Sequence, residues 1–143
     1  MRFVLDASVT LSWLLKDTAA RDEAYPLAVL NALRAASTTA IVPMTWGLEI
    51  PNVIARSEAK DLVTAAQSGS FIALLEGISI EVDAETFTHV LSDTLQLSRR
   101  YRLSSYDASY LELALRNGSP IATLDEDLRR AATKAGVKLF KPT

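Results

Sequence analysis

The sequence predicts an α/β protein of three layers, in which a parallel sheet of about five strands lies between two layers of helices. Short apolar stretches, typical of buried strands, alternate along the chain with longer stretches of helical periodicity. The apolar fraction is 49%, which is enough for a substantial core. The length of 143 residues suits one domain, so residues 1–143 are expected to form a single unit.

The first three elements are expected within residues 1–36. Residues 3–5 form an uninterrupted apolar run and are expected to be a buried strand. Residues 8–16 and residues 21–36 have apolar side chains at helical spacing, which predicts two helices. Pro26 suits the first turn of the second helix, where its missing N–H would have no partner in any case.

The next stretch predicts one strand and two helices. Residues 40–43 form a short apolar strand that ends at a proline, and residues 45–59 have a helical pattern. Pro51 lies within that pattern, where it either kinks the helix or marks its start. Residues 61–75 are expected to form a helix that one of two glycines breaks or ends.

The third stretch predicts a strand followed by two helices. Residues 78–82 alternate between apolar and polar side chains, as a strand does. Residues 84–101 predict a long amphipathic helix with apolar side chains along one side. Residues 106–116 predict a helix that stops at the following Asn-Gly pair, a common C-terminal signal.

The C-terminal part of the chain is expected to supply the last two strands. Residues 121–124 and residues 137–140 are short and apolar, and residues 127–134 between them have a helical pattern that ends near Gly136. Helical stretches therefore separate the strands along the whole chain, which favours a parallel sheet covered on both faces.

Charge and composition exclude several function classes. The chain has 15 Lys and Arg against 17 Asp and Glu, a formal net charge of −2, so a nucleic acid would have to be held by a local basic patch or through a metal ion. Cysteine is absent, which excludes disulfides, thiolate metal sites and a cysteine nucleophile. His89 is the one histidine that a catalytic triad could use. We also expect a cytoplasmic protein without a membrane segment, because no apolar run reaches the necessary length.

Four carboxylates lie where ligands bind in open parallel sheets, beyond the C-terminal ends of the strands. Asp6 follows the first strand directly, and Asp125 follows the strand at residues 121–124. Glu49 lies in the helical stretch after the second strand, and Asp107 is at the start of a helix. If these strands are neighbours, the four side chains converge at one end of the sheet.

A structural explanation for each carboxylate stays open beside this one. Asp6, Asp107 and Asp125 each lie near a helix start, where aspartate caps free N–H groups and suits the helix dipole. Ser104 and Asp107 also fit a capping box. Glu49 lies in an apolar segment, where it would belong to an exposed polar stripe with the residues three and seven positions later.

A hard divalent cation would explain why the four acids lie together. Carboxylates placed close together repel one another and cannot all stay ionised in a partly dry site. Mg²⁺ and Mn²⁺ prefer oxygen ligands, and either ion can generate hydroxide from water and shield a phosphodiester during in-line attack. Ser8 and Thr123, each two residues from an acid, either orient the carboxylates or metal-bound waters, or serve helix capping and strand packing.

The stretches that contain these acids are FVLDASV, LEIPNVIAR and LSSYDASYLELALRNGSPIATLDEDLRRAA. Together they resemble the PIN domain over nearly the whole chain, and within that superfamily the chain looks like a VapC-type toxin of a bacterial or archaeal toxin–antitoxin pair. The resemblance implies a parallel sheet of strand order 3-2-1-4-5 and an endoribonuclease that depends on Mg²⁺ or Mn²⁺. Carried over by position, the catalytic metal ligands would be Asp6, Glu49, Asp107 and Asp125, with Ser8 and Thr123 as supporting hydroxyls.

The same resemblance implies partners and one more acid. The expected partners are an RNA substrate, a small VapB-like antitoxin whose C-terminal segment lies over the acidic site, and a second copy of the chain in a homodimer. Asp127 matches an additional acid of some such proteins, and it equally suits the first turn of a helix. Leucine-rich stripes within residues 27–33 and residues 62–75 are candidates for an amphipathic partner helix, with core packing as the alternative.

Two basic segments are candidates for RNA contacts. Arg99, Arg100 and Arg102 cluster just before Asp107, and we expect this group first to bind RNA phosphates. The last fifteen residues are also basic, with the cations Arg129, Arg130, Lys134, Lys138 and Lys141. Solvated helix faces are the alternative for both groups.

Other function classes fit the sequence less well. A receiver-like signalling domain would have an acidic pair after the first strand, where this chain has a single Asp6. A haloacid-type phosphatase would have a second acid at the position of Ser8. A PIN-domain nuclease that processes RNA outside a toxin–antitoxin system is the main alternative, and a PIN-like binding module without activity is a further one.

Overall fold

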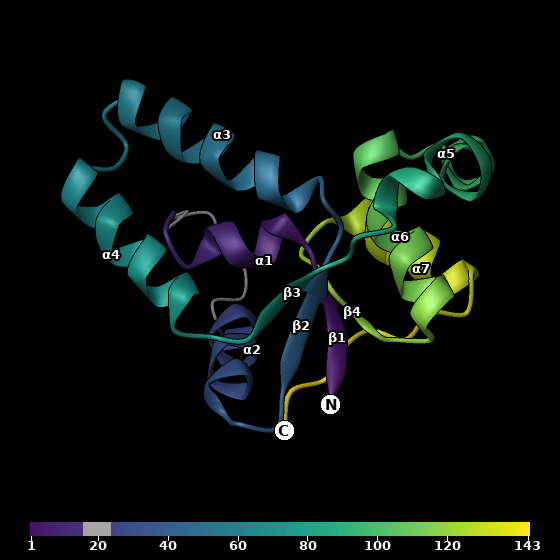
Figure 1. Ribbon diagram of the computed structural model, residues 1–143, viewed down its shortest axis with the longest axis horizontal. Coiled ribbons are helices and arrows are strands. Elements are labelled where there is room, and N and C mark those ends of the chain that lie inside the picture. The colour runs from purple at the N-terminus through teal and green to yellow at the C-terminus, as the bar shows by residue number, and fades with distance from the viewer. Residues whose placement is uncertain (16–23) are drawn as a thin grey trace.

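The computed structural model of the chain has the three-layer α/β fold that the sequence predicts (Figure 1). It describes residues 1–15 and 24–143. Two predicted helix boundaries, the end at Lys16 and the start at Arg21, therefore lie outside the described residues. The strands are β1 (Arg2–Leu5), β2 (Thr39–Val42), β3 (Ile80–Val82) and β4 (Ile121–Ala122). The α-helices are α1 (Ala7–Ser12), α2 (Ala24–Arg34), α3 (Trp46–Ala59), α4 (Ala65–Glu76), α5 (Leu95–Tyr101), α6 (Ser105–Asn117) and α7 (Glu126–Lys134).

The sheet is parallel, and β1 lies between β2 and β4. Among the described residues four strands pair in the order β3-β2-β1-β4, so the expected number of about five is too high. Val4 of β1 is in register with Ile41 on one side and Ile121 on the other. Because β1 is flanked on both sides, Asp6 at its C-terminal end lies at the middle of the sheet edge rather than at a corner.

The predicted last strand, residues 137–140, is reduced to an isolated parallel bridge between Ile121 and Leu139. The bridge lies beside β4, where the order 3-2-1-4-5 places the fifth strand. Two hydrogen bonds make the bridge, from the N–H of Ile121 to the carbonyl of Lys138 at 3.0 Å and from the N–H of Phe140 to the carbonyl of Ile121 at 2.8 Å. The N–H of Val137 donates to the carbonyl of Ala132 at 2.8 Å and closes the end of α7.

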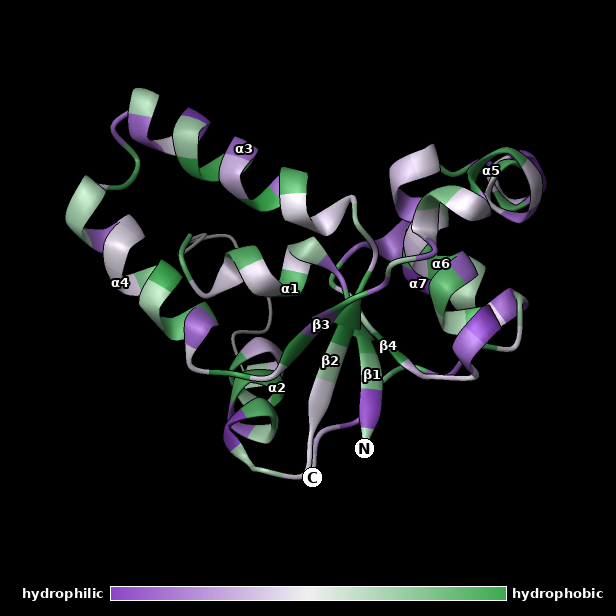
Figure 2. Ribbon diagram, in the orientation of Figure 1, coloured by the Kyte–Doolittle hydropathy of each residue, from purple (hydrophilic) through white to green (hydrophobic). Residues whose placement is uncertain are grey.

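The alternation of side chains along the strands divides the core between the two faces of the sheet. On one face, Phe3 and Leu5 pack with Val29 of α2. On the other face, Val4 packs with buried side chains of α6 and α7, among them Leu111. In Figure 2 the hydrophobic colour concentrates on the C-terminal halves of β1 and β2, which these two clusters enclose. The sheet is therefore anchored from both sides close to the end where the acids lie.

The predicted helix of residues 84–101 is wrong in its first half. Thr86–Thr88 form a 3-10 turn (η1), and Val90–Thr94 form a short π-helix (η2). The α-helix α5 covers only the second half of the predicted segment. An apolar pattern of helical period does not distinguish these turns from an α-helix, because all three bring residues three to five positions apart onto one side.

Hydrogen bonds and exposure show why this segment departs from the prediction. The carbonyl of His89 accepts from the N–H of Ser92 at 3.2 Å and from the N–H of Thr94 at 3.1 Å, so it bonds three and five residues ahead. Phe87 and Leu91, two of the apolar side chains on which the predicted helix was based, are 60% and 85% exposed.

The predicted helix of residues 61–75 begins four residues late. Asp61 has a φ of +56° and takes the left-handed conformation, which ends the preceding segment. Thr64 then forms a capping box with Gln67, so the helix starts at Ala65. It runs without a break to the residue before Gly77.

The helix that contains Glu49 begins at Trp46, five residues before Pro51. Pro51 therefore does not mark the start of the helix, and the helix continues through it. In residues 1–15 and 24–143 no helix combines the length and the apolar composition that a membrane span requires.

Candidate active site

Asp6 is the most deeply buried of the predicted site carboxylates and lies just beyond the C-terminal end of β1. The residue is 4% exposed. Two hydroxyls donate to its Oδ2 atom, Ser8 Oγ at 2.5 Å and Thr123 Oγ1 at 2.8 Å. Burial raises the pKa of the Asp6 carboxyl, and the two hydrogen bonds oppose that rise. Although Asp6 is at the N-cap position of α1, its carboxylate is held by these hydroxyls.

Ser8 and Thr123 also join the ends of β1 and β4. Ser8 Oγ accepts from the N–H of Leu124 at 2.9 Å, and Thr123 Oγ1 accepts from the N–H of Asp125 at 3.0 Å. These N–H groups are therefore not available to a strand ladder, which is why β4 ends before the predicted residue 124. The two hydroxyls therefore hold the Asp6 carboxylate, and Thr123 also holds the backbone at Asp125.

Glu49 comes from the first turn of α3 and is half-buried. The hydroxyl of Tyr110, a fully buried residue of α6, donates to Glu49 Oε1 at 2.9 Å. The pKa of Glu49 is raised to about 6, mainly by burial. The Tyr110 hydrogen bond opposes this rise, and the negative charges of Asp6 and Asp107 contribute to it. The alternative that placed Glu49 on an exposed polar stripe is therefore wrong.

Asp107 lies in the first turn of α6 and is half-buried. Its N–H donates to Ser104 Oγ at 3.1 Å, so Ser104 caps the helix and one arm of the predicted capping box is present. Burial, together with the charges of Asp125 and Asp6, raises the pKa of Asp107 to about 6. Asp107 contributes to the cap through its N–H, and a hydrogen bond between its side chain and Ser104 opposes the rise in its pKa.

Asp125 caps a helix and also lies within electrostatic reach of the other predicted site acids. Its Oδ1 accepts from the N–H of Leu128 at 2.9 Å, so it caps α7 as the structural explanation proposed. Its negative charge also raises the pKa values of Asp6 and Asp107, which places it within electrostatic reach of both. Because a carboxylate has two oxygens, a cap through Oδ1 does not use up its capacity as a ligand.

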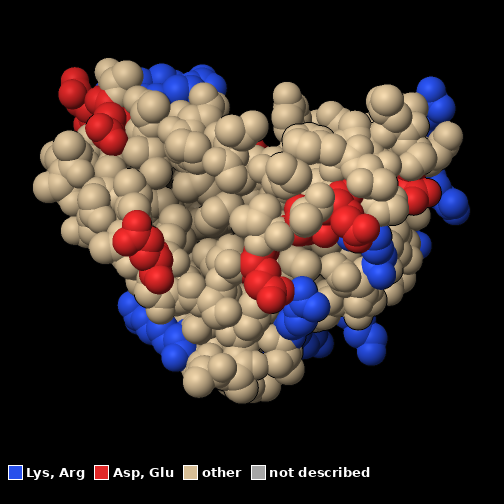
Figure 3. Space-filling view, in the orientation of Figure 1, with Lys and Arg blue, Asp and Glu red and all other residues tan. Residues whose placement is uncertain are grey.

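Four segments that are distant in the sequence thus bring carboxylates to one end of the sheet. Asp6, Glu49 and Asp107 have raised pKa values, and in each case neighbouring acids contribute to the rise. Figure 3 shows the surface notched between the side that carries α3 and α4 and the side that carries α5 and α6. At neutral pH the negative charges of these carboxylates are not fully compensated by neighbouring groups. A bound cation would relieve the repulsion among them.

The donor set fits a hard divalent cation that is bound partly through water. Within residues 1–15 and 24–143, no group of three or more His, Cys, Asp or Glu side chains is arranged to hold a metal ion directly. Mg²⁺ in proteins typically uses one or two carboxylates and keeps several waters, so it does not need such a group. Oxygen donors whose pKa values are raised by burial and like charge are the ones that such an ion neutralises.

Asp127 and the predicted RNA-binding arginines lie at the margin of this site. Asp127 Oδ1 accepts from Arg130 at 2.5 Å, and both side chains are exposed. The charge of Asp127 still makes a small contribution to the raised pKa of Asp107. Arg100 and Arg102 line a cavity together with Asp127, whereas Arg99 is exposed on α5 and does not line it.

Sequence reasoning did not assign Tyr110 to the site. Tyr110 follows Asp107 by three positions on α6, and residues at this spacing share a helix face, so the signal was present. What the sequence did not show is that this face is buried against the start of α3. The hydrogen bond to Glu49 links two of the acidic segments and makes Tyr110 a positioning residue for that carboxylate.

A second group of buried charges lies outside the site, and we call it the Arg116 cluster. It consists of Arg116, Asp83 and Glu112, of which the two acids are 8% and 4% exposed. The guanidinium donates to both Asp83 oxygens, at 3.1 and 2.7 Å, and to Glu112 Oε2 at 2.8 Å. Thr86 Oγ1 adds a hydrogen bond to Asp83 at 3.0 Å. The cluster joins the segment after β3 to α6, the helix that also supplies Asp107.

Comparisons with known proteins are consistent with this fold. A family model described as the PIN domain matches residues 3–134. The structure of PAE2754 from Pyrobaculum aerophilum is similar with a TM-score of 0.66 at 19% identity, over 92% of this chain and 79% of that one. VapBC2 from Rickettsia felis, bound to a DNA fragment from their promoter, gives a TM-score of 0.66 at 12% identity, over 98% of both chains. FitAcB from Neisseria gonorrhoeae gives 0.62 at 16% identity, over 99% of this chain and 98% of that one. A comparison with curated proteins gives no match.

Proposed function

Because the chain belongs to the PIN domain family, we propose that it is a metal-dependent endoribonuclease that hydrolyses RNA phosphodiester bonds. The observation that carries the proposal is the convergence of Asp6, Glu49, Asp107 and Asp125 from four separate segments, with mutual repulsion among them. Buried like charges destabilise a fold unless a partner compensates them, so their presence together supports a bound cation of the Mg²⁺ or Mn²⁺ type. The match to the PIN domain family also argues against the alternative that this chain is a receiver-like signalling domain.

The four carboxylates are proposed to hold the ion, and each is positioned differently by its neighbours. When bound, a divalent ion supplies hydroxide from water at neutral pH and shields the charge of the phosphodiester. Ser8 and Thr123 hold Asp6 in a fixed orientation through Oδ2, so its Oδ1 is available toward the ion. Tyr110 holds Glu49 through Oε1, which leaves Oε2 to bind the ion or to accept a proton from the attacking water.

We further propose that the protein is the toxin of a VapBC-type toxin–antitoxin pair. Two features support this assignment: the stretches around the four acids resemble VapC-type toxins, and the fold is similar to VapBC2 over 98% of the chain. A small VapB-like antitoxin would then bind the protein and cover the acidic site, and two copies would form a homodimer. A nuclease that processes RNA outside such a pair is the alternative.

The leucine-rich stripes divide into core and surface residues, which narrows the candidate contacts for an antitoxin. Core packing explains Leu30, Leu33 and Phe71, which are buried. The residues Leu27, Leu62 and Ile72 are exposed. These three exposed side chains are the part of the predicted stripes that an amphipathic partner helix would contact.

Cleavage of RNA in the presence and absence of metal tests the nuclease proposal. The purified protein is incubated with structured RNAs, tRNA included, in Mg²⁺, in Mn²⁺ or in EDTA. We expect cleavage that EDTA abolishes and that is lost in Asp6→Asn and Asp107→Asn. Asp61→Asn is the matched control, because Asp61 is exposed in the α3–α4 loop and asparagine suits its left-handed backbone. Cleavage that persists in EDTA, or in both site variants, would show that the mechanism is wrong.

The toxin assignment is tested separately by growth. Expression of the wild-type chain in a bacterial host is expected to arrest growth, and expression of Asp6→Asn is not. Co-expression of a short reading frame from immediately upstream, where one is present, should restore growth and co-purify with the chain. Metal-dependent cleavage without growth arrest would favour the alternative of an RNA-processing nuclease.

A further inference from the structure

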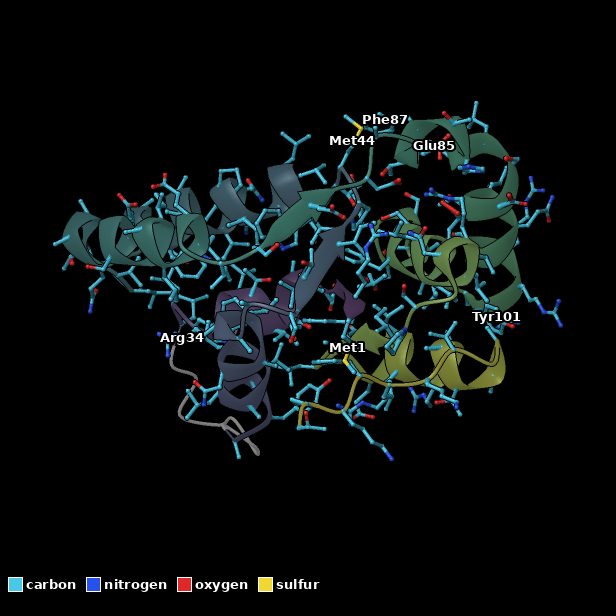
Figure 4. The ribbon with its side chains drawn as sticks, turned by 60° about the horizontal axis from the view of Figure 1, so that its bottom comes forward. Met1, Arg34, Met44, Glu85, Phe87 and Tyr101 are labelled. Carbon is cyan, nitrogen blue, oxygen red and sulfur yellow. The ribbon has the colours of Figure 1, made fainter. Side chains whose placement is uncertain are left out.

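A cavity of about 370 Å³ opens between the end of α5 and α7, and its lining includes Asp127, whose charge contributes to the raised pKa of the site residue Asp107. From the α5 side it is lined by Arg100, Tyr101 and Arg102. From α7 it is lined by Asp127, Arg130, Ala131 and Lys134. Figure 4 shows Tyr101 at the end of α5, next to α7, which agrees with these two walls.

The charge of this cavity is opposite to that of the whole chain. Its described lining contains four cations, which are Arg100, Arg102, Arg130 and Lys134, and one carboxylate, Asp127. The chain as a whole has a formal net charge of −2. Four cations around one small concavity repel one another in the free protein, so the cavity favours a ligand with several negative charges.

The backbone at the α5 wall is held in an uncommon conformation that places Arg102 at the cavity. Arg102 has a φ of +54°, in the left-handed region that glycine or asparagine usually occupies at a helix end. The buried neighbour Leu103 fixes this turn, because its N–H donates to the Ser98 carbonyl at 3.1 Å and its own carbonyl accepts from Ser98 Oγ at 2.5 Å. An arginine in such a place, where the backbone favours other residues, points to a use for its side chain.

The remaining cations come from regular positions on the two walls. The Arg100 guanidinium lies 5.6 Å from the centre of the Tyr101 ring, a cation–π distance that restrains it. Arg130 and Lys134 are four residues apart on α7, so they project from the same side of that helix. Arg130 is also held by Asp127. The two walls therefore present guanidinium and ammonium groups at several separate points.

Both walls of the cavity are close in sequence to residues of the acidic site. On one side the chain passes from Arg102 through the cap residue Ser104 to Asp107. On the other side Asp127 follows the site residue Asp125 at the start of α7. A polymer whose scissile bond lies at the four acids would therefore reach the basic cavity with its neighbouring units.

We propose that this cavity, lined by Arg100, Arg102, Arg130 and Lys134, binds the backbone phosphates of the RNA strand next to the bond that is cleaved. The proposal rests on the proposed nuclease function. It explains how a chain with a net negative charge could bind a polyanion, since the four cations form a local basic patch. Guanidinium groups donate two parallel hydrogen bonds to a phosphate and remain charged at all relevant pH values. Asp127 limits the affinity, because its charge repels the phosphate and occupies Arg130.

RNA binding in EDTA tests this site without any cleavage. The affinity of the full chain for a fluorescently labelled single-stranded RNA is measured by anisotropy at several salt concentrations. Arg102→Asn, which suits the left-handed backbone, and Lys134→Gln should each weaken binding by about 3- to 10-fold at low salt. Each should also reduce the slope of log affinity against log salt by about 0.7, the value for one phosphate contact on a single strand.

Two variants make the test specific to this cavity. Arg34→Gln is the matched control, because Arg34 is also an exposed cation in the last turn of a helix, and Figure 4 shows it on the opposite side of the molecule from Tyr101. It should bind RNA as the wild type does. Asp127→Asn should bind RNA more tightly than the wild type, by about 2- to 5-fold, because it removes the one acid of the described lining.

The outcomes separate this proposal from the nuclease proposal. Loss of binding in Arg102→Asn and Lys134→Gln supports the phosphate site, even if no RNA is cleaved with Mg²⁺. Unchanged binding in both variants, or an equal loss in Arg34→Gln, overturns the site, even if cleavage depends on Asp6 and Mg²⁺. An absence of measurable RNA binding by the wild type at low salt also overturns it. Circular dichroism of each variant checks that the fold is retained. Arg102→Asn and Lys134→Gln are chosen because asparagine suits the left-handed backbone and Lys134 is exposed.

Discussion

The two groups of buried acids in this protein are built in opposite ways. In the Arg116 cluster, the hydrogen bonds from Arg116 hold the pKa of Asp83 below its usual range. At the candidate site, burial raises the pKa values of Asp6, Glu49 and Asp107, and the acids raise one another's further. Both groups contact α6, so a single helix separates a compensated cluster from an uncompensated one.

This difference indicates which group is structural and which is functional. Buried carboxylates beside a guanidinium hold elements together, and the Arg116 cluster joins α6 to the segment after β3. Buried carboxylates without a cation weaken the fold at neutral pH, so a protein retains them together where a ligand completes the site. The comparison predicts that the two groups respond oppositely to substitution, to pH and to metal.

Substitution of one carboxylate in each group should have the largest and most contrasting effects, a loss of activity at the candidate site and a loss of stability in the Arg116 cluster. Asp6→Asn is expected to lower RNA cleavage at least about 100-fold, equal to about 2.7 kcal/mol. Its metal-free stability should be at least that of the wild type, because asparagine keeps an acceptor for Ser8 and Thr123 and removes a buried charge. Asp83→Asn should retain cleavage and lose stability. Initial rates and urea unfolding measure the two effects, and the comparison fails if both variants lose stability equally.

Removal of the cation from the Arg116 cluster should give the largest loss of stability. Arg116→Gln leaves Asp83 and Glu112 buried without a compensating charge, and we expect a loss of about 2–3 kcal/mol in the free energy of unfolding. Urea unfolding followed by circular dichroism measures it. Arg56→Gln, an exposed arginine near the end of α3, is the control and should change stability by less than about 0.5 kcal/mol. Equal stability of the two variants would contradict the assignment of a structural role to the cluster.

Loss of the Tyr110 hydroxyl should affect cleavage less than loss of an acid. Tyr110→Phe keeps the ring in the core and removes the hydrogen bond to Glu49, so we expect a decrease of about 5- to 20-fold in cleavage rate. The variant should also move the pH profile of cleavage, since the hydroxyl lowers the pKa of Glu49. Tyr25→Phe is the matched control, because its hydroxyl also donates a hydrogen bond, to the carbonyl of Phe140 at 2.8 Å, and it belongs to neither the acidic site nor the basic cavity. A rate and a pH profile equal to those of the wild type would exclude a positioning role for Tyr110.

The smallest expected effect is on the pH dependence of stability. As the pH rises, the candidate site should lower the free energy of unfolding and the Arg116 cluster should raise it. Glu49 and Asp107 have folded-state pKa values of about 6, above their usual 4.5 and 3.8. The folded state therefore binds more protons between pH 4 and 6, and the metal-free protein should lose stability as the pH rises through about 6. The lowered pKa of Asp83 stabilises the fold above its usual value of 3.8, and this contribution is lost at lower pH. Thermal unfolding between pH 3 and 8 measures both, and a stability that rises between pH 5 and 7 would contradict the account of the site.

The sequence predicts the central part of the fold well because local pattern and tertiary packing agree there. The apolar run that became β1 and the strand that became β2 are buried on both faces, so an uninterrupted apolar stretch is an adequate signal. The segment of residues 84–101 shows where the signal fails. Its apolar spacing fits a helix, but His89 bonds three and five residues ahead, and Leu91 faces solvent. Which side of such a segment is buried depends on its neighbours, and these are not visible in the sequence.

The candidate site also contains residues that the sequence could place and contacts that it could not. Asp6 and Asp125 could be placed because Asp6 directly follows β1 and Asp125 lies three residues after β4, and the position of a strand end is a local property. The Tyr110–Glu49 contact and the Arg116 cluster could not be predicted, because they join charges or polar groups that lie 61 and 33 residues apart. Arg102 shows the same limit, since its cavity forms only when α7 packs beside the end of α5.

Binding of Mn²⁺, measured by electron paramagnetic resonance of the free ion, is the most direct test of the central claim that the uncompensated acids form a metal site. The wild type and Asp83→Asn should bind Mn²⁺ with the same affinity, because the Arg116 cluster is already compensated. Asp6→Asn and Asp107→Asn should weaken binding at least about 10-fold, since each removes a charge from a site with few carboxylate ligands. Equal binding by the wild type and Asp6→Asn, or a loss of binding in Asp83→Asn alone, would contradict the account.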